Sequence, residues 1–337
     1  MTETQGQDAK TFAGHDPRPE QALHSATHNI AVLIPCYNEE AAIHDAVTGF
    51  KTMLPAARIY VYDNNSQDRT SEIARAAGAI VRNEPLQGKG NVVRRMFSDV
   101  EADIYILVDG DNTYEAAAAP RLVEALIDQR LDMITGSRVT DIAKAYRPGH
   151  KFGNWMLTSL VAYFFGRRTR DMLSGYRVFS RRFIKSFPAL SRGFEIETEL
   201  TVHALELRMP IADIETVYID RRPGSESKLS TYRDGLRILR MIVNLVKEER
   251  PFQFFAFVSV VLIALAMILF YPILTDFIAT GLVPRLPTAV LVATIFLMAV
   301  LSFVVGVILD TVTLGRREIK RLHYLSFAAV GRNDRPE

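Results

Sequence analysis

The sequence has little of what marks several common protein classes. Its 337 residues include one cysteine, Cys36, and one tryptophan, and Lys plus Arg number 40 against 38 for Asp plus Glu. A single cysteine excludes an internal disulfide, which is consistent with a reducing compartment. A net charge of +2, without a dense stripe of basic and aromatic residues away from the apolar segments, gives no reason to expect a nucleic-acid partner. We expect Cys36 to be a small buried residue rather than a nucleophile.

The N-terminal segment lacks the apolar core of a signal peptide. Residues 1–28 are polar, with scattered Gln, Asp, His and Pro. This composition is typical of a disordered tail, so we expect the folded part of the chain to begin at residue 29.

Apolar residues are in excess, and they concentrate near the C-terminus. Hydrophobic residues make up 48% of the chain, and the mean hydropathy is +0.07. Two uncharged stretches, Phe252 to Leu274 and Thr288 to Leu309, are each long enough to cross a hydrocarbon layer of about 30 Å as a helix. Two buried core helices are the alternative, but the short connecting loop favours a transmembrane hairpin over residues 251–314.

Basic residues flank both ends of this hairpin. Lys247 and Arg250 precede it, and further cations follow it at Arg316, Arg317, Lys320 and Arg321. Under the positive-inside rule both flanks are cytoplasmic. We therefore expect a multi-pass protein of the inner (cytoplasmic) membrane, with residues 1–28 and 315–337 as cytoplasmic tails. The paired apolar spans also offer a surface for self-association into a homo-oligomer.

The region between the first tail and the hairpin alternates strand-like and helix-like segments. Apolar strand-like runs cover residues 30–34, 58–62, 79–81, 104–108 and 133–135. Helical patterns cover residues 39–53, 68–77, 89–100 and 116–130. This alternation predicts an α/β domain with a mostly parallel sheet that helices cover on both faces. In such a sheet, ligands bind beyond the carboxyl ends of the strands.

Two segments combine apolar residues with basic flanks. Residues 152–165 are almost entirely apolar and contain Trp155, and residues 232–250 set apolar positions against arginines such as Arg237. Both patterns are typical of helices that lie in a membrane interface. A buried core helix is the alternative for the first segment. We expect interfacial helices, including an amphipathic one over 230–250, that hold the domain against the bilayer surface.

Polar clusters follow the predicted strands, at Pro35–Glu40, Asp63–Ser66, Gln87–Asn91, Asp109–Asp111 and Gly136–Arg138. Because strand side chains alternate between faces, we expect the Asp109 and Asp111 carboxylates to point the same way, and Gly110 to let a diphosphate approach the backbone. Such a pair can bind a divalent metal. An Asp-x-Asp string alone more often marks a turn or an N-cap, so the prediction depends on the clusters together.

In this order, the clusters resemble glycosyltransferase family 2, and specifically its dolichyl- or polyprenyl-phosphate branch. The segment Val32–Glu40 looks like the family's first strand and nucleotide loop. The segment Asp63–Thr70 is similar to its Asp-Asp-Gly-Ser-x-Asp-Gly-Thr motif, with departures at Asn64, Asn65 and Arg69. Four further matches follow: Gly88-Lys89-Gly90, the metal motif Asp109-Gly110-Asp111, the acceptor segment Asp171–Arg177 and the loop Arg222–Lys228.

The resemblance implies a GT-A type nucleotide-sugar domain over residues 29–229 with Mg²⁺ or Mn²⁺ held by Asp109 and Asp111. Thr113 stands where some relatives carry glutamine, so we expect no third ligand from that side chain. For Asp63 an ordinary turn is the alternative, and for Lys89 a solvated surface position. The expected donor-binding residues are Pro35, Tyr37, Asn38, Glu39, Asp63, Lys89, Asp109 and Gly110.

The implied reaction is an inverting displacement in which an acceptor phosphate attacks the anomeric carbon of the sugar. We assign the catalytic roles to Asp111 and Asp171. A phosphate monoester with a second pKa near ~6 is already ionised at neutral pH, so Asp171 orients the acceptor or metal as much as it removes a proton. Acidic residues Glu195, Glu197 and Glu199 suit a helix start and stay outside this set. The cations expected to hold the acceptor phosphate are Arg138, Arg177, Arg222 and Lys228.

The expected function is sugar transfer from a nucleoside-diphosphate sugar, preferably a UDP-sugar by analogy with bacterial relatives, to a polyprenyl phosphate such as undecaprenyl phosphate. A same-fold enzyme with a diacylglycerol- or ceramide-type acceptor is one alternative, and a non-catalytic membrane scaffold is another. A polysaccharide synthase of the family would carry Gln-x-x-Arg-Trp before its membrane helices. The only tryptophan, Trp155, lies far upstream of them.

Overall fold

The computed structural model describes residues 28–139, 171–191, 193, 195–219, 244, 247, 248 and 250–331. Several predictions fall outside the described residues. These are the tail before residue 28, the interfacial helix around Trp155, most of the amphipathic segment 230–250, and the phosphate-binding positions Arg222 and Lys228.

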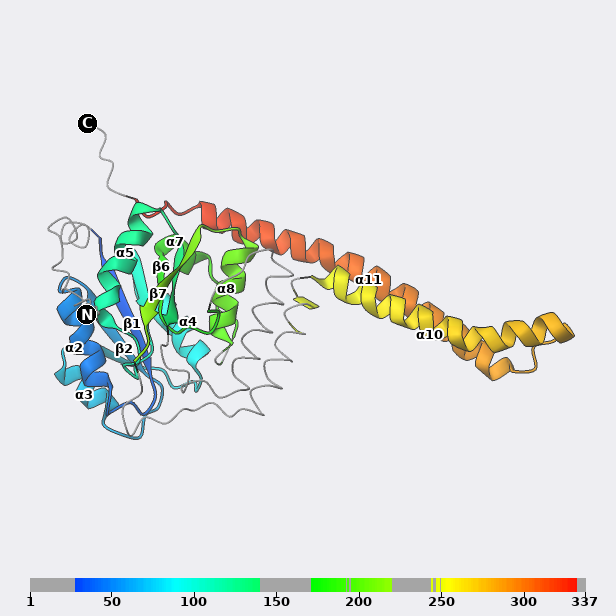
Figure 1. Ribbon diagram of the computed structural model, residues 1–337, viewed down its shortest axis with the longest axis horizontal. Coiled ribbons are helices and arrows are strands. Elements are labelled where there is room, and N and C mark those ends of the chain that lie inside the picture. Colours follow the sequence, from blue (N-terminus) through cyan, green and yellow to red (C-terminus); the bar gives the residue numbers. More distant parts are fainter. Residues whose placement is uncertain are drawn as a thin grey trace, which may run out of the picture.

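A seven-stranded sheet runs through the N-terminal domain in the order β3-β2-β1-β4-β6-β5-β7 (Figure 1). Its strands are β1 (Ile30–Cys36), β2 (Arg58–Asp63), β3 (Ile80–Asn83), β4 (Ile104–Leu107), β5 (Met133–Val139), β6 (Arg177–Ser180) and β7 (Ile211–Val217). Of these described strands, only β6 is antiparallel to its neighbours, β4 and β5. The predicted α/β fold with a mostly parallel sheet is confirmed, and β6 and β7 are additions to it.

Alternating residues of the buried strands feed two hydrophobic cores, one on each face of the sheet. In β1, Val32 and Ile34 pack with α2 (Ile43–Met53), α3 (Thr70–Ala76) and α5 (Ala119–Asp128), which follows the short 3₁₀ helix η1 (Ala116–Ala118). The intervening residues, Ala31 and Leu33, pack on the other face. That face is covered by α4 (Lys89–Asp99), α7 (Arg181–Ser186) and α8 (Ile196–Glu206).

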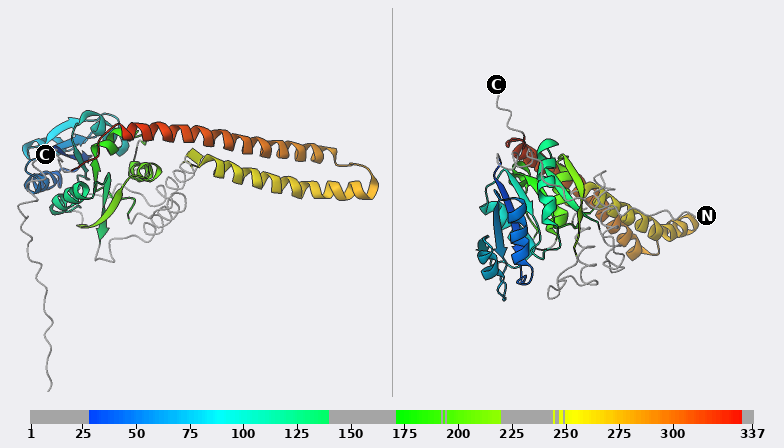
Figure 2. Two further views of the ribbon diagram at one scale, coloured as in Figure 1. Left: turned by 90° about the horizontal axis from the view of Figure 1, so that it is seen from above. Right: turned by 60° about the vertical axis from the view of Figure 1, so that its left-hand side comes forward.

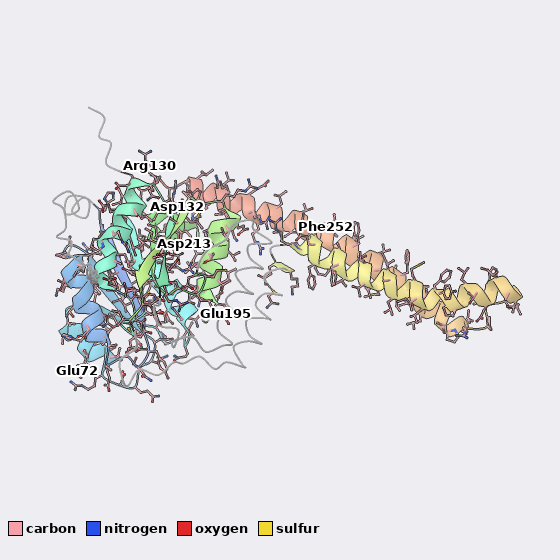
Figure 3. All side chains as sticks on the ribbon, in the orientation of Figure 1. Glu72, Arg130, Asp132, Glu195, Asp213 and Phe252 are labelled. Atoms are coloured by element: carbon pink, nitrogen blue, oxygen red, sulfur yellow. The ribbon has the colours of Figure 1, made fainter. Side chains whose placement is uncertain are left out.

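Two long helices, α10 (Pro251–Thr280) and α11 (Leu286–Leu325), form an antiparallel hairpin that projects from the domain (Figures 1 and 2). Their most apolar 18-residue windows have mean hydropathies of 2.7 and 2.8, and only 11% of each window is buried. Side chains project outward along the whole hairpin beyond Phe252, as a lipid-facing surface would require (Figure 3). Both helices are candidate membrane spans, and they contain the two stretches predicted from the sequence.

The helix does not end at residue 314, the expected end of the membrane hairpin: α11 continues to Leu325, and its last turns dock on the domain. Arg317 and Lys320 pair with the buried carboxylate of Glu206 at 3.2 and 2.8 Å. One turn further on, Tyr324 donates a hydrogen bond to Asp132 at 2.7 Å. Residues 315–325 are therefore fixed to the domain, because side chains of α11 form ion pairs and a hydrogen bond with buried carboxylates of the domain.

Candidate active site

The polar clusters after the strands meet at one edge of the sheet. The ends of β1 and β2 lie side by side, with Cys36 opposite Asp63. Because β6 is antiparallel, its first residue, Arg177, pairs with Leu107 at the end of β4 and with Thr135 of β5. The loops after β1, β2 and β4 and the loop before β6 therefore converge, as the sequence predicted. The cluster Gly136–Arg138 lies within β5, which continues to Val139, and not in a loop after it.

Hydrogen bonds join the loop after β1 to the loop after β2. The Asn38 side chain accepts from the Gln67 amide at 2.8 Å, and the Glu39 amide donates to Thr70 Oγ1 at 2.8 Å. Asn38 itself has a φ of 52°, a left-handed conformation that asparagine tolerates better than most residues. The expected donor-binding positions Tyr37, Asn38 and Glu39 thus lie on a loop that the Asp63 loop supports, and Pro35 lies just before it in β1, opposite Tyr62 of β2.

Asp63 forms a local turn. Its Oδ1 accepts from the Ser66 amide at 2.9 Å and its Oδ2 from the Ser71 hydroxyl at 2.5 Å. The neighbouring Asn64 departs from the family motif and ties two further segments together, since it donates to the carbonyls of Glu84 and Leu86, both at 2.8 Å. It also accepts from the amide of the residue that precedes Lys89, at 2.7 Å. Contact between Asp63 and a nucleobase or ribose stays a prediction.

Lys89 begins α4 and lies between two carboxylates. Its Nζ is 2.5 Å from Asp109 Oδ1 and 2.6 Å from Glu197 Oε1. The side chain is only 8% exposed, so the alternative of a solvated surface lysine is wrong. Burial alone would lower the pKa of Lys89, but the two carboxylates outweigh burial and raise that pKa above its ordinary value. The ammonium is therefore charged at neutral pH.

The Asp109-Gly110-Asp111 motif lies on a turn, because β4 ends at Leu107. Strand alternation is therefore not what orients its carboxylates, and that part of the prediction is wrong. A Cβ on Gly110 would lie 2.5 Å from Cys36 Sγ, so close packing against the buried cysteine already requires glycine here. Asp111 is 6% exposed and accepts from Thr113 Oγ1 at 2.7 Å.

In the segment that was expected to contact the acceptor, Asp171 forms a bidentate ion pair with Arg138. Nε lies 2.6 Å from Oδ2 and Nη2 lies 2.9 Å from Oδ1. The Arg138 guanidinium also lies 5.6 Å from the centre of the Tyr218 ring. This geometry suits an aspartate that positions a cation more than one that removes a proton.

Arg177 is not available to a lipid phosphate, so its predicted role is wrong. The side chain is completely buried and donates to the carbonyls of Met172 and Ser174 at 2.7 and 3.1 Å and to Thr201 Oγ1 at 2.8 Å. Burial lowers the pKa of the guanidinium. Arg177 therefore braces the loop before β6 from within the core, below the carboxylates of the site.

Comparison with known proteins decides the family. The model of glycosyl transferase family 2 matches residues 31–187. The glycosyltransferase AglJ of Haloferax volcanii is 30% identical over 303 residues, which are 88% of this chain and 98% of AglJ. The chain belongs to glycosyl transferase family 2. A second relative from Haloferax volcanii, dolichyl-phosphate hexose transferase, is 27% identical over 66% of this chain and 96% of its own length.

Solved structures agree with this family fold. Glucosyl-3-phosphoglycerate synthase from Mycobacterium tuberculosis, crystallised with Mn²⁺, UDP and its product, has a TM-score of 0.57 and 22% identity. The similarity covers 70% of this chain and 86% of the synthase. The predicted GT-A type domain is thereby confirmed, and the chain is a glycosyltransferase.

The Asp109 and Asp111 carboxylates of this family 2 enzyme are a donor set that fits a divalent metal. Among the described residues, no group of three or more His, Cys, Asp or Glu could bind an ion. Mg²⁺ is commonly held by one or two carboxylates, with substrate phosphates and water completing the shell, and carboxylate ligands also suit Mn²⁺. Asp109 and Asp111 supply that number of hard oxygen donors, and the Thr113 hydroxyl is engaged with Asp111.

Glu197 is the residue that sequence reasoning missed. It lies on α8, 108 positions after Lys89, and was excluded as part of an acidic helix start. No local pattern separates it from Glu199, which accepts from the amides of Leu190 and Ser191 at 2.8 Å. Only the folded structure shows that Glu197 is a buried acidic residue of α8.

Proposed function

We propose that this enzyme transfers a sugar from a nucleoside-diphosphate sugar, with UDP as the preferred carrier, to a polyprenyl phosphate such as undecaprenyl phosphate. The observation that carries the proposal is the direct docking of an apolar helical hairpin onto a nucleotide-sugar domain through Tyr324 and Asp132. The name of the Haloferax dolichyl-phosphate hexose transferase supports a lipid phosphate acceptor. By the charge flanking the hairpin, the domain faces the cytoplasm at the inner membrane.

One group of residues acts on the leaving nucleotide, and a second group acts on the acceptor phosphate. Asp109 and Asp111 would hold Mg²⁺ or Mn²⁺, which when bound neutralises the departing diphosphate. Lys89 adds a protonated ammonium beside them. Arg138, held in place by Asp171, faces the acceptor phosphate, and we assign Arg222 and Lys228 to the same phosphate. One oxygen of this ionised phosphate attacks the anomeric carbon, and the nucleotide leaves from the opposite face.

The test is transfer of radiolabel from a panel of UDP- and GDP-sugars to undecaprenyl phosphate by the detergent-purified full chain. Reactions contain Mg²⁺ or Mn²⁺, or EDTA. Asp111→Asn is compared with Asp128→Asn, which makes the same change at an exposed position at the end of α5. We expect an organic-extractable product that needs metal and is lost only in Asp111→Asn. Product with diacylglycerol or ceramide instead, or no product with any lipid, would overturn the proposed acceptor.

A further inference from the structure

We infer that Lys89 is a movable counter-ion, shared by Asp109 and Glu197 before the donor binds and retained by Glu197 when a divalent cation takes its place on Asp109. This inference rests on the proposed function for the identity of the metal–nucleotide. It makes Glu197 a positioning residue that acts through Lys89. Glu197 lies outside every segment of the chain that resembles a family motif.

Lys89 and Gly175 lie against the two oxygens of Asp109, whose side chain is 29% exposed. Oδ1 is in contact with the ammonium at 2.5 Å. The other oxygen, Oδ2, lies against Gly175 so closely that a Cβ on that glycine would overlap it. A divalent ion and the Lys89 ammonium repel each other when both contact Asp109, so we expect binding of the ion to push Nζ away from Oδ1.

The displaced ammonium has a partner already in place. Glu197 Oε1 lies 2.6 Å from Nζ, and the Glu197 side chain is only 9% exposed. A buried carboxylate that loses its cation is strongly disfavoured, so Glu197 keeps Lys89 within the site. The lysine stem has four methylene carbons, and rotation about its bonds would let Nζ turn from Asp109 toward a diphosphate on the same metal.

Two substitutions should then have opposite effects on binding of the metal alone. Lys89→Met removes the competitor from Asp109, so Mn²⁺ should bind more tightly by about tenfold or more. Glu197→Gln removes one of the two carboxylates that Lys89 contacts. The ammonium then stays on Asp109 and competes with the ion there, so Mn²⁺ should bind several-fold more weakly. Both variants should lower kcat, because Lys89→Met deletes the ammonium and Glu197→Gln deletes the carboxylate that retains it near the leaving group.

The measurement is titration of the full chain in detergent with Mn²⁺ and no nucleotide, followed by the electron paramagnetic resonance signal of the free ion. Asp111→Asn serves as the reference that loses the site. Lys89→Arg keeps the charge and should stay close to the unmodified chain, and Glu197→Asp should restore part of the loss seen in Glu197→Gln. Thermal unfolding of each variant confirms that it is folded.

Unchanged or weaker Mn²⁺ binding in Lys89→Met would overturn the inference, and Lys89→Gln repeats the test if the methionine variant fails to fold. Equal binding in Glu197→Gln and the unmodified chain would remove the role of Glu197. These readouts involve no acceptor. If Mn²⁺ binds more tightly in Lys89→Met and more weakly in Glu197→Gln, but no sugar is transferred to polyprenyl phosphate, the proposed function is rejected and the inference stands.

Discussion

The hydrogen bond between Tyr324 and Asp132 is the most informative place to perturb the docking of the hairpin. Asp132 is fully buried beside the docked end of α11 (Figure 3). It accepts from Tyr324 Oη at 2.7 Å, from Ser180 Oγ at 2.7 Å and from Arg182 at 2.5 and 2.7 Å. The Arg182 guanidinium also lies 4.7 Å from the centre of the Tyr324 ring. Tyr324→Phe deletes one bond to the carboxylate and keeps the ring.

The expected loss follows from the charge on Asp132. A hydrogen bond to a charged group contributes about 1.5–3 kcal/mol, so we expect Tyr324→Phe to lower the free energy of unfolding by about 2 kcal/mol. The cation–π contact with Arg182 should survive. For a domain of roughly 200 residues this corresponds to a fall in Tm of about 4–8 °C. Asp132→Ala should lower the free energy of unfolding by more, about 3–5 kcal/mol, because it leaves the partly buried Arg182 guanidinium without its carboxylate.

The assay is thermal unfolding in detergent, with hydrogen–deuterium exchange to locate the change. Tyr271→Phe makes the same chemical change at a position of α10 that is 69% exposed, and it should leave Tm unaltered. In Tyr324→Phe, exchange should accelerate over residues 315–325 before it does in β1. If Tyr324→Phe and Tyr271→Phe unfold at the same temperature, the bond contributes nothing to docking and the reasoning fails.

Three further predictions concern the domain itself. Burial, with a smaller effect of the Lys320 charge, lowers the pKa of His203 from 6.5 to about 3, so the unfolded chain binds the extra proton. Stability should therefore fall by up to about 1.4 kcal/mol per unit as pH drops below ~6.5, and His203→Phe should flatten the dependence of Tm on pH between 7 and 5. Gly110→Ala should lower Tm through its 2.5 Å contact with sulfur. Adding Cys36→Ala should recover part of that loss, and an equal loss in the double variant would contradict the packing argument. Asp171→Asn should raise KM for the acceptor about tenfold and leave KM for the donor unchanged, because it loosens a bidentate pair; a fall in kcat alone would instead indicate a general base.

Most of the sheet could be predicted because its strands are buried on both faces and read as apolar runs. The runs at 30–34, 58–62 and 104–108 correspond to β1, β2 and β4. β6 could not be recognised, since it is only four residues long and begins with Arg177. Its identity as a strand depends on pairing with β4, about 70 positions upstream, which no local pattern encodes.

The position of the site could likewise be predicted from the sequence, but the role of each charged side chain in it could not. Because ligands bind beyond the carboxyl ends of parallel strands, the sequence alone predicted that the loops of Asn38, Asp63 and Asp109 lie at one edge of the sheet. The sequence could not distinguish a cation that faces a ligand from one that braces the core. Arg138 and Arg177 are both arginines near strand termini, yet the first is partly exposed and the second is completely buried. Burial is a property of the assembled layers, so that distinction had to come from the structure.

Because α11 is one continuous helix, it sets a fixed distance between the apolar part of the hairpin and the N-terminal domain. The apolar stretch ends at Leu309 and the docking bond is made by Tyr324, fifteen residues later in one unbroken helix. At 1.5 Å per residue, these two points are about 22 Å apart along the axis. If the hairpin spans the bilayer as proposed, this rigid length and the pairing of Glu206 with Arg317 fix both the height and the orientation of the domain. A flexible tether would let a nucleotide-sugar domain face any direction. A fixed one favours an acceptor whose phosphate is itself confined to the membrane surface.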